Sequence, residues 1–302
     1  MEKELNFNLA ELFGFLKKKV ISILLLGLGT TLLVIFLSFL SDDYYISSAR
    51  LTVVADQSAP SGSAASFLGG FSGGGGIGGS QLYTKIKEVE EVITSRDFFR
   101  HLLTVNPGIF NDILYADSYN KDLQSIVYLQ GAPAIEDIIN KDKLFSVNEN
   151  FFNAYSQFLQ SFEFTKELKS DFFTISYTHI SPVFANQMLE LVISEANEIQ
   201  KTIEINEANN ALDYLLGEIG VATNAEVRGS MSKLVERQLK TKMIANMREN
   251  YSIKIIDSPF IPTKKSGPLR AIIAILTFIV SILLIIPLYV FLHSKELRKQ
   301  II

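Results

Sequence analysis

The chain has 302 residues, a formal net charge of −4 and no cysteine. The lack of cysteine excludes disulfides, thiolate metal sites and cysteine nucleophiles, so an exported domain must be stabilised by packing or by assembly. The slightly acidic balance offers no electrostatic footprint for a nucleic-acid partner. Once two terminal apolar runs are set aside, the remaining length predicts one extramembrane domain.

Two uncharged apolar runs occupy residues 20–40 and 271–292. As helices rising about 1.5 Å per residue they reach about 31 and 33 Å, against a bilayer core of about 30 Å. Helices buried in a soluble core are rarely apolar on every face over such a length. The two runs therefore predict two transmembrane helices.

The charges beside the first run predict which side of the membrane the middle of the chain faces. Three lysines at 17–19 precede the run and two aspartates at 42–43 follow it, and lysine is retained on the cytoplasmic side. Both termini, 1–19 and 293–302, are then cytoplasmic, and 41–270 lies outside, in a periplasm or its equivalent. A cleaved signal peptide is the alternative, but its apolar core would be shorter, at about 7–15 residues.

The first strand is expected at 44–55, where successive side chains alternate and β-branched residues accumulate. Residues 58–80 consist mainly of Gly, Ser and Ala, and glycine loses too much entropy for a regular element, so a loop or partner-contacting arm is expected. A helix begins near Gln81 and extends or restarts at 98–103. The stretch 106–147 predicts short helices joined by loops.

A further helix is expected at 148–162 and a second strand at 171–179. Ser181 and Pro182 then supply a capping hydroxyl and a proline at the first helical position, which predicts a helix start. A third strand is expected at 252–257. The three strands can form one sheet, and the first and last of them lead directly into the two spans.

Between the second and third predicted strands, residues 182–250 form the longest periodic stretch of the chain. Apolar residues recur there with coiled-coil spacing, first at Ala185, Leu189, Val192, Ala196, Ile199 and Ile203, then in a shifted register at Ala208, Leu212, Leu215 and Ile219. A continuous helix would extend on the order of 100 Å. Gly217, Gly220 and Gly229 make a bend or a hairpin equally compatible with the pattern. A long helix with a modest apolar stripe usually needs partners to stabilise it, and neighbouring subunits could bury this stripe.

Candidate catalytic and cofactor motifs are weak. The glycines at 74, 76 and 79 match the dinucleotide fingerprint literally, but no strand directly precedes them and they lie in a repetitive tract. His101, His179 and His293 lack the i, i+3 or i+4 spacing of metal ligands on one helix. We therefore expect no enzyme activity, no cofactor and no metal.

The informative motifs lie at the membrane. Prolines hold the chain extended before the second span, and small residues at helical spacing allow close approach of another helix. The equally open alternative is that small residues are simply common in membrane helices. We predict that this segment contacts a polymerase or a neighbouring subunit. The residues concerned are Pro259, Pro262, Pro268, Gly267, Ala271, Ala274 and Ser281, with Gly27, Gly29 and Thr31 as counterparts in the first span.

The combined pattern resembles the polysaccharide co-polymerase family, the Wzz-type chain-length determinants of bacterial surface polysaccharides. The resemblance spans the chain and is strongest at its ends, in residues 5–19, YISSA at 45–49 and IKIIDSPFIPTKKSGPLR at 253–270. The passage from Phe172 through Ser181, Pro182, Ala185 and Asn186 is also similar.

This resemblance implies an α+β membrane protein whose two transmembrane helices flank a periplasmic α+β base domain with a long projecting, partly coiled-coil-like helix. It also implies a ring-like homo-oligomer in the bacterial inner membrane, with its main domain in the periplasm. This oligomer works with a membrane-embedded polymerase and sets the modal length of a glycan, with lipopolysaccharide O antigen preferred. Contact with the growing lipid-linked glycan stays open. The alternatives are an adaptor in capsule or exopolysaccharide export and a two-span sensor, and the short C-terminal tail argues against the sensor.

Overall fold

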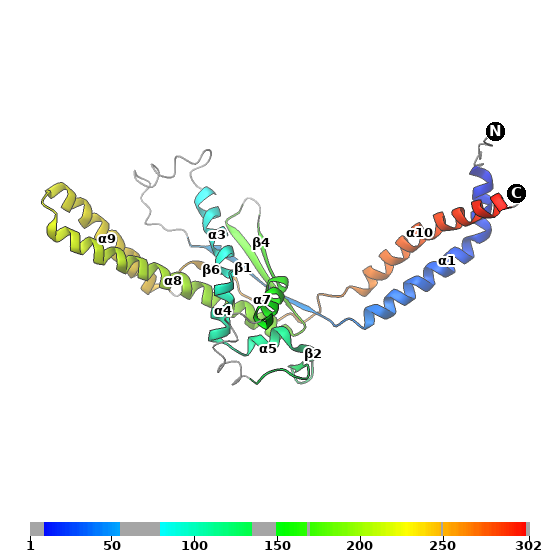
Figure 1. Cartoon of the computed structure of the whole chain (residues 1–302), viewed down its shortest axis with the longest axis horizontal. Coiled ribbons are helices and arrows are strands. Elements are labelled where there is room, and N and C mark those ends of the chain that lie inside the picture. The colour runs from blue at the N-terminus through cyan, green and yellow to red at the C-terminus, as the bar shows by residue number, and fades with distance from the viewer. Residues whose placement is uncertain (1–8, 55–78, 135–148, 168–169, 249, 300–302) are drawn as a thin grey trace. The chain divides into compact units, whose positions relative to one another are not determined.

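The computed structural model describes residues 9–54, 79–134, 149–167, 170–248 and 250–299 (Figure 1). The chain divides into two compact units, one formed by 1–44 with 265–302 and the other by 45–264. Most of the predicted Gly-rich loop, including Gly74 and Gly76, lies outside the described residues.

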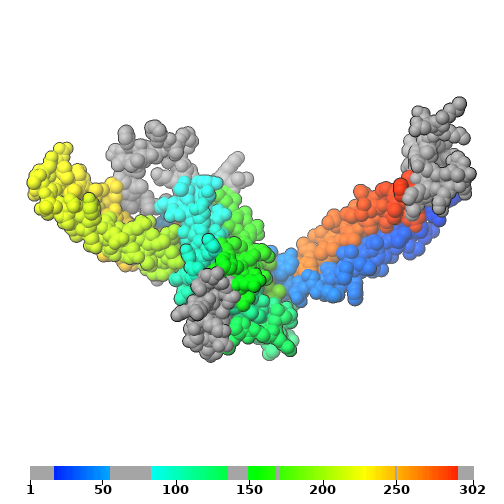
Figure 2. Space-filling model, viewed as in Figure 1, coloured from blue at the N-terminus to red at the C-terminus, as the bar shows by residue number. Residues whose placement is uncertain are grey.

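The first unit is a pair of helices, α1 (Leu9–Phe39) and α10 (Arg270–Lys299), which pack against each other along their length (Figure 2). Their segments Lys17–Phe39 and Arg270–Phe291 are long and apolar enough to cross a membrane. The structure therefore has a helix at each of the two predicted spans.

The second unit is built on a four-stranded antiparallel sheet with the order β4-β5-β1-β6. The three predicted strands are present and share this sheet. The sequence reading missed β4, because its five residues follow directly on a helix and are too few for a clear alternation. The strands are β1 (Tyr45–Val53), β4 (Phe162–Lys166), β5 (Phe172–His179) and β6 (Ile253–Asp257).

Alternation along the strands buries one face of the sheet. Every second residue of β1 is buried, from Tyr45 to Val53, and the same holds for Phe173, Ile175 and Tyr177 of β5. Helix α8 lies across this face, and three shorter helices, together with buried side chains from residues 109–113, complete the core around Phe99. These helices are α3 (Gly79–Ile93), α4 (Arg96–Val105) and α7 (Glu149–Ser161).

The long periodic region is a helical hairpin. Helix α8 (Pro182–Val221) ends at Ala222, and α9 (Ala225–Met247) starts beside it (Figure 1). The predicted start of α8 is confirmed, since Ser181 accepts a hydrogen bond from the Phe184 amide. The second start carries its own cap, because the Asn224 side chain accepts from the Glu226 amide. Of the alternatives that the glycines allowed, the structure therefore has the hairpin.

The apolar stripe of α8 finds most of its partners within its own chain. Its first half, from Ala185 to Ala196, is buried against the sheet, and in its second half Ala208, Leu212 and Leu215 are buried where α9 runs alongside. The expectation that the stripe would pack on neighbouring subunits is therefore wrong for these positions. Only Ile203, between the two halves, remains exposed.

The stretch 106–147, predicted as short helices, contains a helix and a β-hairpin. Helix α5 (Ile109–Leu114) is followed by β2 (Ala116–Asn120) and β3 (Ser125–Tyr128). The Asn120 side chain accepts hydrogen bonds from the amides of Asp122 and Leu123, a local turn bond that favours reversal of the chain. This turn is made by side-chain geometry that apolar periodicity does not report.

A buried asparagine on α8 binds the backbone of the chain where it re-enters the sheet after the hairpin. Asn197 of α8 donates to the Ile253 carbonyl at 3.1 Å and accepts from the amides of Ile253 at 2.8 Å and Ser252 at 3.0 Å. These bonds satisfy backbone groups at the start of β6. Asn197 therefore fixes where β6 begins after the long excursion through α8 and α9.

We expect Asn197→Ala to lower the free energy of unfolding by about 3 kcal/mol, because the substitution leaves buried backbone groups at Ile253 without partners. Thermal unfolding of the detergent-solubilised chain, followed by circular dichroism, measures the loss. Asn210→Ala, at an exposed position of the same helix, is the matched control. Equal melting temperatures for the two variants would contradict this role.

A neutral histidine joins three elements near the start of α8. The Nδ1 atom of His179 accepts a hydrogen bond from the Ser181 amide at 3.1 Å, so Nε2 carries the proton and donates to the Asp112 carbonyl at 3.0 Å. Burial lowers the pKa of His179 to about 4. Because both nitrogens are engaged in the neutral form, protonation breaks the bond to Ser181, the residue that caps α8.

The folded state should therefore lose stability on acidification. Since the folded pKa of His179 lies below the ordinary value of 6.5, its contribution is complete above pH 6.5 and is lost as the pH falls toward 4, by roughly 3 kcal/mol. His179→Gln keeps a donor and an acceptor but does not titrate. The difference in free energy of unfolding between the wild type and His179→Gln should shrink as the pH falls from 6.5 toward 4. A difference that stays constant would exclude His179 as the cause of the acid destabilisation. The pKa of the partly buried Asp112 is raised and acts in the opposite direction, but Asp112 is present in both the wild type and the variant, so its contribution cancels.

Candidate functional site: the membrane-proximal collar and the span pair

Two short segments that flank the spans are joined into what we term the collar, residues 38–44 and 265–270. Tyr44 and Gly267 form an isolated antiparallel bridge, in which the Tyr44 amide donates to the Gly267 carbonyl at 3.0 Å and the Ser266 amide donates to the Tyr44 carbonyl at 2.9 Å. A methyl group at Gly267 would overlap the Tyr44 ring. Glycine is therefore required at this close approach.

Charge reinforces the collar. Asp43 pairs with Lys265 at 2.9 Å and with Arg270 at 3.2 Å. The Arg270 guanidinium also donates to the carbonyls of Ser38 and Ser41 and lies 4.8 Å from the centroid of the Phe39 ring. These contacts occupy carbonyls at the C-terminal end of α1, where a cation is favoured. Arg270 therefore holds the end of the first apolar helix beside the start of the second.

Small residues allow the two spans to pack closely. On α1, Gly27 and Thr31 are buried, and a Cβ atom at Gly27 would lie 3.3 Å from the Ser281 hydroxyl of α10. A hydrogen bond of 2.9 Å joins the Ser22 and Tyr289 hydroxyls farther along the pair. In a hydrocarbon environment, packing of this kind and interhelical hydrogen bonds stabilise helix association.

The small residues singled out from the sequence do not all lie on this contact. Gly267 lies before α10 and belongs to the collar, so the helical spacing expected from Gly267 onward is wrong at that position. Ala274 lies on the partly buried face of α10 together with Ser281, whereas Ala271 is exposed. In α1, Gly29 is also exposed and has open space around it. Gly27, Thr31, Ala274 and Ser281 thus form the packed set.

The three predicted prolines lie in two separate places. Pro268 belongs to the collar, directly before α10, whereas Pro259 and Pro262 belong to the second unit. There the chain runs beside β1, since the Ser47 hydroxyl donates to the Phe260 carbonyl at 2.8 Å, and Pro262 is buried. These contacts hold the chain extended after β6. The contact with a polymerase or neighbour predicted for this segment remains a prediction.

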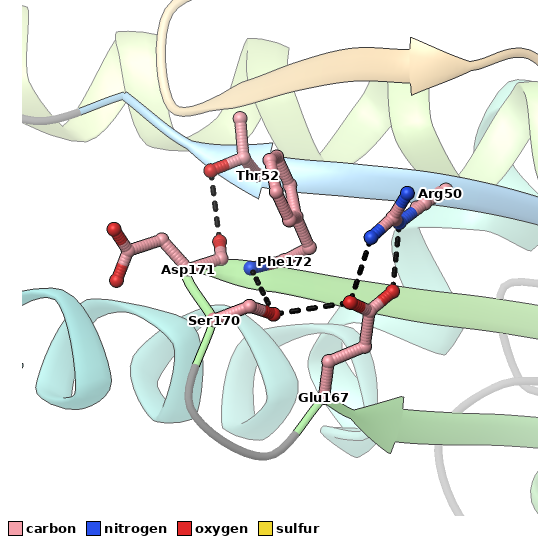
Figure 3. Close-up of polar contacts among 6 residues, drawn as sticks. All are labelled: Arg50, Thr52, Glu167, Ser170, Asp171 and Phe172. Atoms are coloured by element: carbon pink, nitrogen blue, oxygen red, sulfur yellow. Dashed lines mark hydrogen bonds and ion pairs between the residues drawn. The ribbon is translucent and has the colours of Figure 1, made fainter.

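The outer face of the sheet carries an ion pair that no pattern in the sequence predicts (Figure 3). Arg50 of β1 donates two hydrogen bonds of 2.7 Å to the carboxylate of Glu167, which also accepts from the Ser170 hydroxyl at 3.1 Å. The Arg50 guanidinium lies 4.6 Å from the centroid of the Phe172 ring. The hydrogen bonds from Arg50 hold the pKa of Glu167 below its usual value. The cluster ties the end of β4 to β1 and β5, which is a structural role.

The described residues show no arrangement suited to metal-dependent catalysis. No group of three or more His, Cys, Asp or Glu side chains among them could hold a metal ion. His101 contacts Glu195 at 2.7 Å, and His179 is used in backbone contacts. His293 lies in α10, with its side chain outside the described set.

The comparisons with known proteins point in one direction. Residues 5–104 match the family model described as "Wzz: Chain length determinant protein". The predicted resemblance to the Wzz family is confirmed. The matched segment contains the first span, β1 and helices α3 and α4, so it includes the α1 half of the collar. No curated protein matches the chain.

Two solved structures are similar to parts of the chain. A fragment of WzzB, a polysaccharide co-polymerase from Salmonella Typhimurium, is 11% identical over 75% of this chain and 100% of its own, with a TM-score of 0.29. A full-length bacterial polysaccharide co-polymerase is 11% identical over 95% of this chain and 97% of its own, with a TM-score of 0.34. At these TM-scores the superpositions carry no argument, and the resemblance to the Wzz family rests on the match of residues 5–104.

The two glycines of the first span provide a matched test of the span pair. We expect Gly27→Leu to lower the melting temperature of the detergent-solubilised chain, because overpacking against Ser281 costs about 1–3 kcal/mol. Gly29→Leu makes the same chemical change two residues away, where the space is open, and should leave the melting temperature unchanged. If both variants melt like the wild type, α1 and α10 do not pack through Gly27.

Proposed function

We propose that this protein is a non-enzymatic regulator of surface polysaccharide chain length, which acts as an oligomeric scaffold in the bacterial inner membrane together with a polymerase. Both termini are cytoplasmic in this proposal, and the sheet and hairpin lie in the periplasm. Lipopolysaccharide O antigen is the preferred polymer, and an adaptor role in capsule or exopolysaccharide export is the alternative.

The observation that carries the proposal is the anchoring of one sheet at two adjacent strands. β1 follows the first span after a few residues, β6 precedes the second span, and the two strands pair with each other. The collar joins the two connecting segments again. Such an arrangement supports a scaffold whose sheet is connected to the membrane through two adjacent strands. It agrees with the Wzz match of residues 5–104.

Exposed apolar side chains on the hairpin support assembly into a homo-oligomer. On α8, Ile203, Tyr214 and Val221 are exposed at spacings of 11 and 7 residues, which places them on one face of the helix. On α9, Leu239, Met243 and Met247 repeat every four residues and are also exposed. These side chains are available for contact with a neighbouring subunit. Groups of large apolar side chains on a protein surface commonly mark such interaction sites.

A deletion strain separates the proposed function from its alternative. We expect that removal of the gene changes the length distribution of lipopolysaccharide on a gel while synthesis continues, because a scaffold regulates length without making bonds. Complementation with the wild-type chain should restore the distribution. Loss of all surface polymer without altered lengths would support the export adaptor, and an unchanged ladder would contradict chain-length regulation.

A further inference from the structure

A surface cleft between the start of α4 and the start of α7 combines aromatic rings with arginines. It is lined by Arg96, Asp97 and Arg100 from α4 and by Phe151, Phe152 and Tyr155 from α7. The cleft lies within the second unit and shares no residue with the collar or the span pair. Neither the prediction from the sequence nor the proposed scaffold role uses these side chains.

The aromatic wall of the cleft is rigid. The rings of Phe151 and Tyr155 lie nearly parallel, 7° apart with centroids separated by 6.5 Å, and both contact the buried Phe99. The Tyr155 hydroxyl donates to the Thr94 carbonyl at 2.6 Å, which fixes that ring to the connection between α3 and α4. A preorganised wall of this kind loses little entropy when a ligand binds.

One aromatic side chain of the cleft is presented to solvent. Phe152 is 45% exposed and stands edge-on to Phe151, with ring centroids 5.7 Å apart. The face of an aromatic ring attracts the weakly positive C–H groups of a flat partner. A pyranose ring offers such a C–H face, so Phe152 is a suitable platform for a sugar.

The arginines of the cleft have N–H donors available to bind an anion. Arg100 contacts Asp97 at 2.6 Å and lies 5.7 Å from the centroid of the Phe151 ring, which holds its guanidinium in place at the rim. Arg96 is exposed, and within the described residues its side chain makes no hydrogen bond or ion pair. With one carboxylate against two guanidiniums, the cleft has an excess of positive charge. Guanidinium groups recognise carboxylates through paired N–H donors.

We propose that this cleft binds an acidic sugar unit of a polysaccharide, with the pyranose ring on Phe152 and the sugar carboxylate on Arg96 and Arg100. The inference rests on the proposed function and deepens it, since it names the chemical class of glycan that the base domain contacts. No bond is made or broken at the site, and its effect is to retain the polymer.

The chain offers a direct reporter for this binding. It contains no tryptophan, so Phe152→Trp introduces a single indole into the cleft and keeps an aromatic face. The full-length variant in detergent is titrated with trigalacturonate, and its fluorescence should change saturably. Maltotriose, a neutral sugar of the same length, should require at least about tenfold higher concentration, because it lacks the charged partner of the arginines.

Arginine substitutions in the Phe152→Trp background test the charge recognition. Arg96→Gln should raise the half-saturating concentration of trigalacturonate by about tenfold, whereas Arg237→Gln, at an exposed position of α9, should leave it unchanged. Saturation-transfer NMR on the wild-type chain should show the same sugar contact, which excludes a site created by the indole.

Several outcomes would overturn the inference. These are the absence of saturable binding, equal binding of maltotriose and trigalacturonate, an Arg96→Gln variant that binds like the control, and equally tight binding of triglutamate, which would make the cleft a site for acidic peptides. None of these results concerns the proposed function, which the polysaccharide gel tests independently. An altered gel with no sugar binding would therefore remove only this inference.

Discussion

The architecture depends on the pairing of β1 on both of its edges. This strand lies between β5 and β6, so one antiparallel sheet holds the segment that leaves the first span and the segment that approaches the second. β1 and β6 are separated by about 200 residues in sequence. Bringing them together costs loop-closure entropy that the buried face of the sheet and the cover of α8 must offset.

The hairpin of α8 and α9 is the other consequence of this closure. A single straight helix would carry the chain far from the sheet, whereas the turn at Ala222 and Asn224 returns it to the start of β6. Asn197 then receives the returning strand by binding its backbone at Ile253. Helix α8 thus covers the sheet, packs against α9 and binds the start of β6. A substitution at Asn197 is therefore expected to disturb β6.

Much of the fold follows from local patterns. Apolar runs locate both spans, alternation locates β1 and β5, and Ser181 with Pro182 locates the start of α8. β4 and the β2–β3 hairpin were missed, because short strands and side-chain turns leave little periodic signal. At the site, the prolines and Gly267 pointed to the correct segment, but Tyr44, Asp43 and Arg270 make contacts between residues more than 200 positions apart, and no spacing rule reports such pairs.

The sequence by itself determined where the chain can enter a membrane, which segments are amphipathic and that no cysteine chemistry is available. These properties depend on side-chain type and local period alone. Only the tertiary structure decided that the apolar stripe of α8 is buried within its own chain, that Gly27 and not Gly29 meets α10, and that Phe152 and Arg96 line the same cleft. These facts are set by which surfaces meet, and that depends on the free energy of the whole packed arrangement.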